Sequence, residues 1–147
     1  MKVVVQRVRE ASVTVGGEES GRIGRGFLVL AGFGRGDTEA TLAWMARKIV
    51  SLRVFEDEAG LMNLPLEAVG GGILVVSQFT LYGDCRKGAR PSFEKSARPD
   101  EARRLYEIFL ERIRAEAPGP VASGVFQERM QVSLVNDGPV TLVIEKE

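Results

Sequence analysis

Short apolar runs separated by glycine turns constrain the fold of this chain more than any other feature of its sequence. Met1–Val8 holds three consecutive valines and is typical of a buried strand. In Ala11–Val15 apolar and polar side chains alternate up to Gly16-Gly17, a dipeptide that favours a two-residue hairpin turn. Gly26–Phe33 is again a continuous apolar run. These segments predict an antiparallel meander at the start of the chain.

Two longer segments have the 3.6-residue periodicity of amphipathic helices. The first runs from about Asp37 to Ser51, and we expect Asp37 to be its N-cap. The second runs from about Pro99 to Ala117. Proline suits the first turn of a helix, and Pro118 follows the predicted end.

The remaining segments predict further strands. Residues 52–57 ("LRVFED") and 72–79 ("GILVVSQF") are strand-like and are separated by a glycine-rich loop over 61–72. Residues 129–136 and 139–147 close the chain as two strands, joined by a hairpin turn at Asp137-Gly138. We therefore predict one α/β domain over residues 1–147, with a mainly antiparallel, barrel-like sheet and two helices.

The composition excludes several kinds of chemistry. The 147 residues include no histidine and one cysteine, so neither a histidine-dependent triad nor an ordinary zinc site can be assembled within one chain. We expect no metal and no cofactor. The 20 basic residues balance 20 acidic ones, so nucleic acid would have to bind a local basic patch. No apolar run is long enough for a membrane span, and we expect a cytoplasmic protein with no membrane partner.

Polar side chains follow the predicted strand at 72–79. Strand alternation would put Ser77 and Phe79 on one face and Gln78 and Thr80 on the other. These groups form a candidate site, although polar residues at a sheet edge can also serve only to satisfy the backbone.

A basic segment comes next. Between residues 86 and 98 one acid, Glu94, stands among five cations: Arg86, Lys87, Arg90, Lys95 and Arg98. Pro91, Ser92 and Phe93 add a rigid turn, a hydroxyl and an aromatic ring. The combination favours a contact surface for phosphates and a stacked base, and the alternative is a solvated loop.

Two other features offer competing sites. "GFGRGD" (residues 32–37) lies between a predicted strand and a predicted helix, where phosphate-binding loops occur, so a nucleotide-binding enzyme using Gly32–Gly36 is one alternative. A flexible turn explains the same glycines. Cys85 stands beside two cations that could lower its pKa, but no histidine is present to serve as its base.

Three motifs in order, "SQFTLYGD", "KGARPSF" and "VNDGPVT", resemble the D-aminoacyl-tRNA deacylase family, and the resemblance extends over the whole chain. It implies an α/β homodimer that hydrolyses the ester between a D-amino acid and the terminal adenosine of tRNA. It also implies catalytic residues at Ser77–Thr80 and pocket residues at Leu81, Met130 and Asn136. Gly138-Pro139 would form a cis peptide that reaches into the partner subunit's pocket. Before Met130 this chain has Gln127-Glu128-Arg129, where the family usually has small residues.

The implied substrate removes the need for histidine. An aminoacyl ester is already activated, and the neighbouring 2′-hydroxyl of the ribose can assist its hydrolysis. Orientation and oxyanion stabilisation then suffice, with the N–H groups of Phe79 and Thr80 as candidate donors and Gln78 as a positioning group. Thr80 as a nucleophile is an alternative, and a non-catalytic tRNA-binding module is another. A rigid backbone wall at Gly138-Pro139 would reject L-amino acids, and glycyl-tRNA should be cleaved as well.

Overall fold

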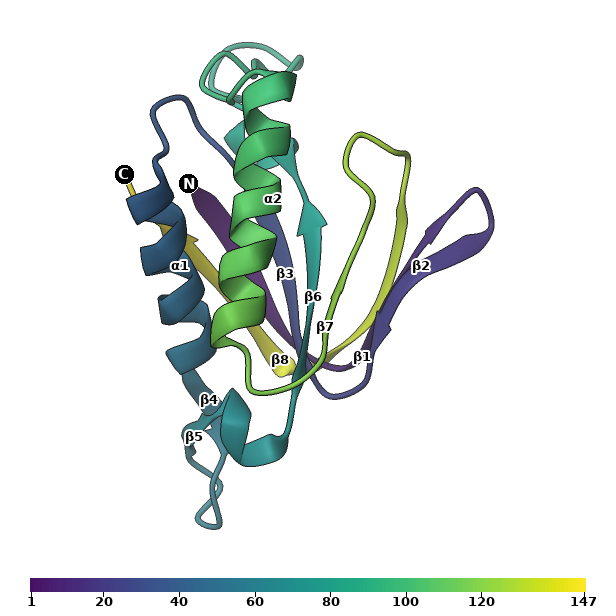
Figure 1. Ribbon diagram of the computed structural model, residues 1–147, viewed down its shortest axis with the longest axis vertical. Coiled ribbons are helices and arrows are strands. Elements are labelled where there is room, and N and C mark those ends of the chain that lie inside the picture. Colours follow the sequence, from purple (N-terminus) through teal and green to yellow (C-terminus); the bar gives the residue numbers. More distant parts are fainter.

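Two helices cover one face of a curved six-stranded sheet in the computed structural model, which describes residues 1–147 (Figure 1). The strands of this sheet are β1 (Lys2–Val15), β2 (Glu18–Ile23), β3 (Gly26–Gly32), β6 (Gly72–Ser77), β7 (Val121–Ser123) and β8 (Gln131–Glu145). The helices are α1 (Glu39–Ser51) and α2 (Pro99–Glu116). This confirms the predicted α/β fold with two helices. No helix is long and apolar enough to cross a membrane.

Strand β1 organises the sheet. Its first half pairs with β3 and its second half with β2, through the predicted hairpin at Gly16-Gly17. The predicted meander is therefore wrong in its pairing, because β2 and β3 both lie against β1 and not against each other. A strand of 14 residues is long enough to hold two shorter partners in succession.

The end of the chain differs from the predicted hairpin. Residues 131–145 form one strand, β8, which runs antiparallel to β1 along almost its whole length. The register moves from Gln6–Thr141 to Val8–Asn136, so residues 137–140 lie opposite Arg7 alone. Asp137-Gly138 is thus part of a bulge and not a turn, because the chain keeps its direction and its partner on both sides.

Two strand pairs are parallel, which the sequence patterns did not predict. β6 lies parallel to β3 and β7 lies parallel to β6. Each parallel pair needs a long crossover, and α1 and α2 lie in these two connections. The first connection also contains a hairpin of β4 (Arg53–Glu56) and β5 (Met62–Pro65), followed by the 3₁₀ helix η1 (Leu66–Val69). The predicted loop at 61–72 is therefore largely structured.

The N-cap of the first helix lies one residue later than predicted. Thr38 is the N-cap of α1: its hydroxyl accepts from the N–H of Thr41, and the Thr41 hydroxyl accepts from the N–H of Thr38. The carboxylate of Asp37 instead accepts from the ammonium group of Met1, at 2.6 Å, and from the N–H of Gly34, at 2.7 Å. The negatively charged carboxylate of Asp37 thus already accepts a backbone N–H of the "GFGRGD" turn, which disfavours phosphate binding there.

The main core lies between the helices and the sheet. The apolar face of α2 is fully buried there through Leu105, Phe109 and Ile113. A smaller cluster on the opposite face includes Leu28, Leu74 and Val76, and the first half of β8 packs against it. The sheet therefore curls around a second core, which gives it the predicted barrel-like form.

Candidate active site

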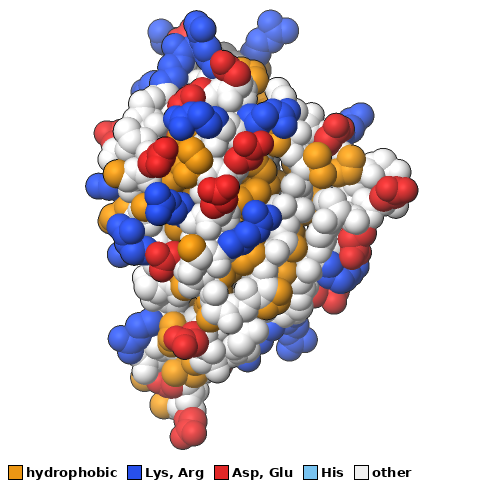
Figure 2. Space-filling model, in the orientation of Figure 1, with side chains coloured by type: hydrophobic (Ala, Val, Ile, Leu, Met, Phe, Trp, Pro, Cys, Tyr) orange, Lys and Arg blue, Asp and Glu red, His pale blue; other side chains and the backbone are white.

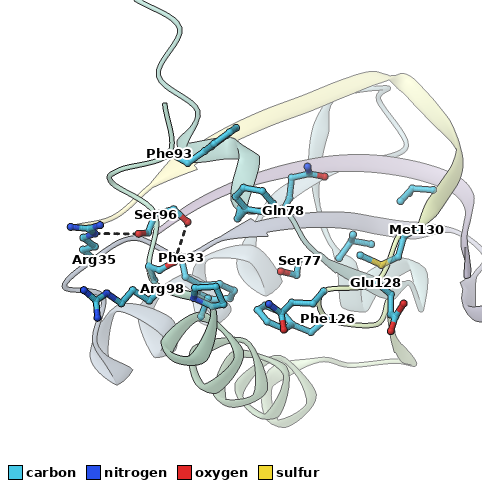
Figure 3. Close-up of a pocket in the computed structure, with 17 residues that line it drawn as sticks. Phe33, Arg35, Ser77, Gln78, Phe93, Ser96, Arg98, Phe126, Glu128 and Met130 are labelled. Atoms are coloured by element: carbon cyan, nitrogen blue, oxygen red, sulfur yellow. Dashed lines mark hydrogen bonds between the residues drawn. The ribbon is translucent and has the colours of Figure 1, made fainter. Parts of the chain in front are cut away.

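A cavity of about 740 Å³ lies where β6 ends, beside the N-terminus of α2 (Figure 3). Its walls come from four parts of the chain: the segment 33–35 that follows β3, the end of β6, the segment 93–102 that leads into α2, and the segment 126–132 that leads into β8. Ser77, Gln78 and Phe79 line it together. The polar end of β6, found from sequence, therefore faces a cavity with a partly apolar lining, the usual setting of a small-molecule site.

The backbone changes direction at this point. The N–H of Gln78 makes the last sheet hydrogen bond, to the carbonyl of Ala31 at 2.7 Å, and Phe79–Tyr82 then form the 3₁₀ helix η2. The expected strand alternation is thus wrong beyond Ser77, because the strand has ended there. The first N–H groups of a helix have no partner within it, and those of Phe79 and Thr80 donate to no group outside the regular elements.

The side chains of this segment divide between pocket and surface. The amide nitrogen of Gln78 donates to the hydroxyl of Thr80. Thr80 is exposed and does not line the cavity, and Leu81 also lies outside it. Ser77, Gln78 and Phe79 therefore line the cavity directly, while Thr80 contacts the lining residue Gln78 from outside it.

Aromatic rings line much of the cavity. The Phe79 ring is 54% exposed and meets the Phe93 ring edge-on, with centroids 5.1 Å apart. On the opposite wall Phe126 packs on Tyr106 at 5.7 Å. Burial raises the pKa of Tyr106 to about 12, so its hydroxyl stays protonated and donates to the carbonyls of Val75 and Gly124. An exposed ring at the mouth of an apolar cavity is a platform for a planar ligand.

The unusual "QER" segment forms part of the wall. Gln127 has a φ of +63°, and its side-chain oxygen accepts from Arg103 of α2 at 2.9 Å. The Arg103 guanidinium also lies over the Phe126 ring, 4.9 Å from its centroid. Gln127, Glu128 and Met130 line the cavity. Of the three residues that depart from the expected small ones, Gln127 is held by α2 and lines the cavity, Glu128 lines it as well, and Arg129 lies outside it.

The cavity has charged groups at both ends. Arg35 and Arg98 lie together at one end, and Glu128 lies at the other (Figure 3). The guanidinium of Arg35 donates to the carbonyl of Ser96. Sequence patterns did not indicate Phe126, and they raised Arg35 only within the Gly32–Gly36 alternative and Glu128 only within the segment before Met130, because each comes from a loop far along the chain from β6.

The basic segment lies at the end of the molecule beyond the cavity, at the top of Figures 1 and 2. Of the residues predicted to bind tRNA, Phe93 lines the cavity, whereas Arg86, Lys87, Arg90, Pro91 and Ser92 lie outside it. Arg86 forms an ion pair with Asp84 at 2.5 Å and holds the pKa of that carboxyl well below its usual range. Lys87 and Arg90 form no ion pair, so they carry the free positive charge of this tip.

The Gly138-Pro139 peptide is cis, as the resemblance implies, and both residues are exposed. They do not line the cavity of their own chain, and neither does Asn136. The buried Arg7 donates to the carbonyl of Asp137 and pairs with its carboxylate. Asn136 donates to the carbonyls of Arg7 and Val140, on both sides of the bulge. The dipeptide is thus held rigidly at a surface away from the site.

Residues 4–145 match the family described as D-Tyr-tRNA(Tyr) deacylase. The chain belongs to this family. It is 60% identical over 145 residues to the D-aminoacyl-tRNA deacylase of Chlorobaculum tepidum, which covers 99% of this chain and 97% of that protein. The identity to the D-aminoacyl-tRNA deacylase of Desulfitobacterium hafniense is also 60%, covering 100% of this chain and 98% of that one.

Solved structures share the fold. A structure described as c-Myc DNA Unwinding Element Binding Protein has a TM-score of 0.94 and 46% identity, covering 100% of this chain and 99% of that one. A probable eukaryotic D-amino acid tRNA deacylase has a TM-score of 0.81 at 22% identity, covering 97% of both chains. At that identity the second likeness shows the fold alone. The deacylase family predicted from three motifs is therefore confirmed.

Proposed function

We propose that this protein hydrolyses the ester that joins a D-amino acid to the terminal adenosine of tRNA. The observation that carries the proposal is the cavity, which is lined by Ser77–Phe79, a segment whose motif marks the family. The cavity has an apolar, aromatic wall for a base and a short stretch of polar groups for the ester. Aminoacyl-tRNA is made in the cytoplasm, and we expect the protein to act there.

Catalysis would rest on orientation and on stabilisation of the oxyanion. The N–H groups of Phe79 and Thr80 are free to donate to the developing negative charge, and fixed donors of this kind are effective in a site that excludes water. Gln78 is held by Thr80 and would position the ester or the ribose hydroxyl. The Thr80 hydroxyl has an amide and not a base as its partner, so it is poorly suited to be a nucleophile.

Chiral selection would require a second copy of the chain. Gly138-Pro139 is exposed, rigid and outside its own cavity, which supports a role across a dimer interface. Val135 and Val143, on the same outer strand, are 46% and 68% exposed, and such apolar side chains favour burial against a partner. In the dimer, the backbone of one subunit would form the wall that excludes L side chains from the other subunit's cavity.

The decisive experiment incubates the protein with matched D- and L-tyrosyl-tRNA and follows release of the amino acid. We expect rapid cleavage of the D ester and little cleavage of the L ester. Glycyl-tRNA should also be cleaved, because hydrogen stands where an L-residue carries its side chain. If tRNA binds and no ester is cleaved, the protein is a non-catalytic tRNA-binding module and the proposal is wrong.

A further inference from the structure

No acidic residue lines the end of the cavity that holds Arg35 and Arg98, and Asp37, in the same turn as Arg35, is paired with the Met1 ammonium. Neither guanidinium forms an ion pair, and the Arg98 side chain makes no hydrogen bond. Two acids near the start of the helices, Glu39 and Glu101, are already paired with Arg104. Both guanidiniums thus lie at one end of the cavity without an ion-pair partner, and a bound anion would be attracted to both.

The two arginines are held by segments that are tied together. The N–H of Arg35 donates to the carbonyl of Lys95, at 3.1 Å, and the N–H of Ala97 donates to the carbonyl of Phe33, at 2.9 Å. The Arg35 Nε donates to the Ser96 carbonyl, which leaves its terminal nitrogens free. Since these bonds fix both loops before any ligand arrives, little ordering would be needed to bind an anion between the two side chains.

We propose that Arg35 and Arg98 form a clamp for the phosphodiester on the 5′ side of the terminal adenosine. This inference rests on the proposed function. With the ester at Ser77–Phe79, the nucleoside lies along the aromatic wall and its 5′-phosphate falls at one end of the cavity. Glu128 would repel a phosphate at the other end. The charges of the cavity therefore set the direction in which the aminoacyl-adenosine enters it.

The clamp is distinct from the basic tip of the molecule. Lys87 and Arg90 lie outside the cavity and can meet phosphates further along the tRNA. Arg35 and Arg98 meet only the phosphate next to the reacting nucleotide. Guanidinium groups match a phosphate with paired, charge-assisted hydrogen bonds, which are stronger than neutral ones.

Binding of two small ligands tests the clamp without any catalysis. Titration calorimetry should give a dissociation constant about tenfold lower for adenosine 5′-(methyl phosphate), which carries the phosphodiester charge, than for adenosine. The preference should shrink in Arg35→Gln and in Arg98→Gln and disappear in the double variant. Arg47→Gln and Arg53→Gln, in a groove at the other end of the molecule, should keep it. An equal affinity of the unmodified protein for both ligands would overturn the clamp.

A second experiment compares the cleavage of two small substrates, one with and one without the 5′-phosphodiester charge. The ratio of kcat/KM for 3′-D-tyrosyl-adenosine with and without a 5′-methyl phosphate should be about ten in the unmodified protein and near one in the double variant. Cleavage of D-tyrosyl-tRNA together with a ratio of one would contradict the clamp alone. Failure to cleave D-tyrosyl-tRNA would contradict the proposed function, and the binding titration would then still decide whether the arginines hold a phosphate.

Discussion

The end of β6 and the bulge in β8 are both rigid and both carry a family motif, but they face different surroundings. Ser77–Phe79 line an enclosed cavity of their own chain, whereas Gly138-Pro139 is exposed and outside it. Hydrogen bonds from Arg7 and Asn136 hold the bulge in place. Gly138 and Pro139 nevertheless do not line the cavity of their own chain. This difference is what the proposed role of Gly138-Pro139 in a second copy of the chain would require.

The largest effect should come from Gly138→Ala. Gly138 has a φ of +123°, and an added methyl group would lie 2.9 Å from the Arg7 guanidinium. Strain of about 1–3 kcal/mol and a displaced carbonyl should lower D-tyrosyl-tRNA cleavage at least about tenfold. Gly60→Ala is the matched control, because Gly60 also has a positive φ, +77°, but an open surrounding. It should lower the melting temperature slightly and leave activity intact.

Mixing variants tests whether the two regions act across subunits. We expect Gly138→Ala and a Ser77→Ala, Gln78→Ala double variant each to be strongly impaired on its own. In a mixed dimer one site combines the intact β6 end with the intact bulge, so exchange of subunits should restore part of the activity. If subunits are shown to exchange and no activity returns, both regions serve the cavity of the same chain.

A smaller effect is expected for Phe79→Ala. The ring is 54% exposed, so its loss should hardly change the free energy of unfolding, but stacking of a base is worth about 1–3 kcal/mol. KM for D-tyrosyl-tRNA should therefore rise about tenfold with little change in melting temperature. Leu61→Ala removes an apolar side chain that is 64% exposed from the β4–β5 hairpin and serves as the control. Similar KM values for the two variants would contradict the stacking of a base on the Phe79 ring.

A still smaller effect distinguishes the cations of the tip. Lys87→Ala or Arg90→Ala should reduce the slope of log K against log salt for tRNA binding by about 0.7 per lost phosphate contact. Arg86→Ala should change the slope less, because Asp84 already neutralises Arg86. D- and L-charged tRNA should respond alike, since this surface does not meet the amino acid. If the slope is unchanged in all three variants, this segment does not contact tRNA phosphates and is only a solvated loop.

No effect is expected from removal of divalent metals. The chain has no histidine and one cysteine, and no cluster of three potential metal-ligating side chains occurs in the structure. Deacylation should persist in a chelator, provided that the tRNA stays folded. Loss of activity that Zn²⁺ restores would show that a metal completes the site where the two regions meet.

Local patterns predicted the elements of this fold better than their partners. The periodicity of α2 and the apolar run of β6 are properties of short segments, and both predicted segments closely match the observed elements. Pairing depends on the whole chain: Asp137-Gly138 has the sequence of a hairpin turn, but a continuous partner in β1 makes it a bulge. The same limit applies to the site, since Ser77 follows a recognisable strand whereas Arg35 and Glu128 reach the cavity only through tertiary folding.

The buried Met1 ammonium has a practical consequence for how the protein can be handled. Its side chain and that of Asp37 are 0% and 5% exposed, and its ammonium also donates to the carbonyl of Lys146. An affinity tag fused before Met1 would turn the ammonium into an amide and leave the Asp37 carboxylate without its cation. Purification handles and dyes therefore belong after the exposed Glu147. The same amine should resist acylating reagents until the protein unfolds, so its labelling offers a chemical readout of unfolding.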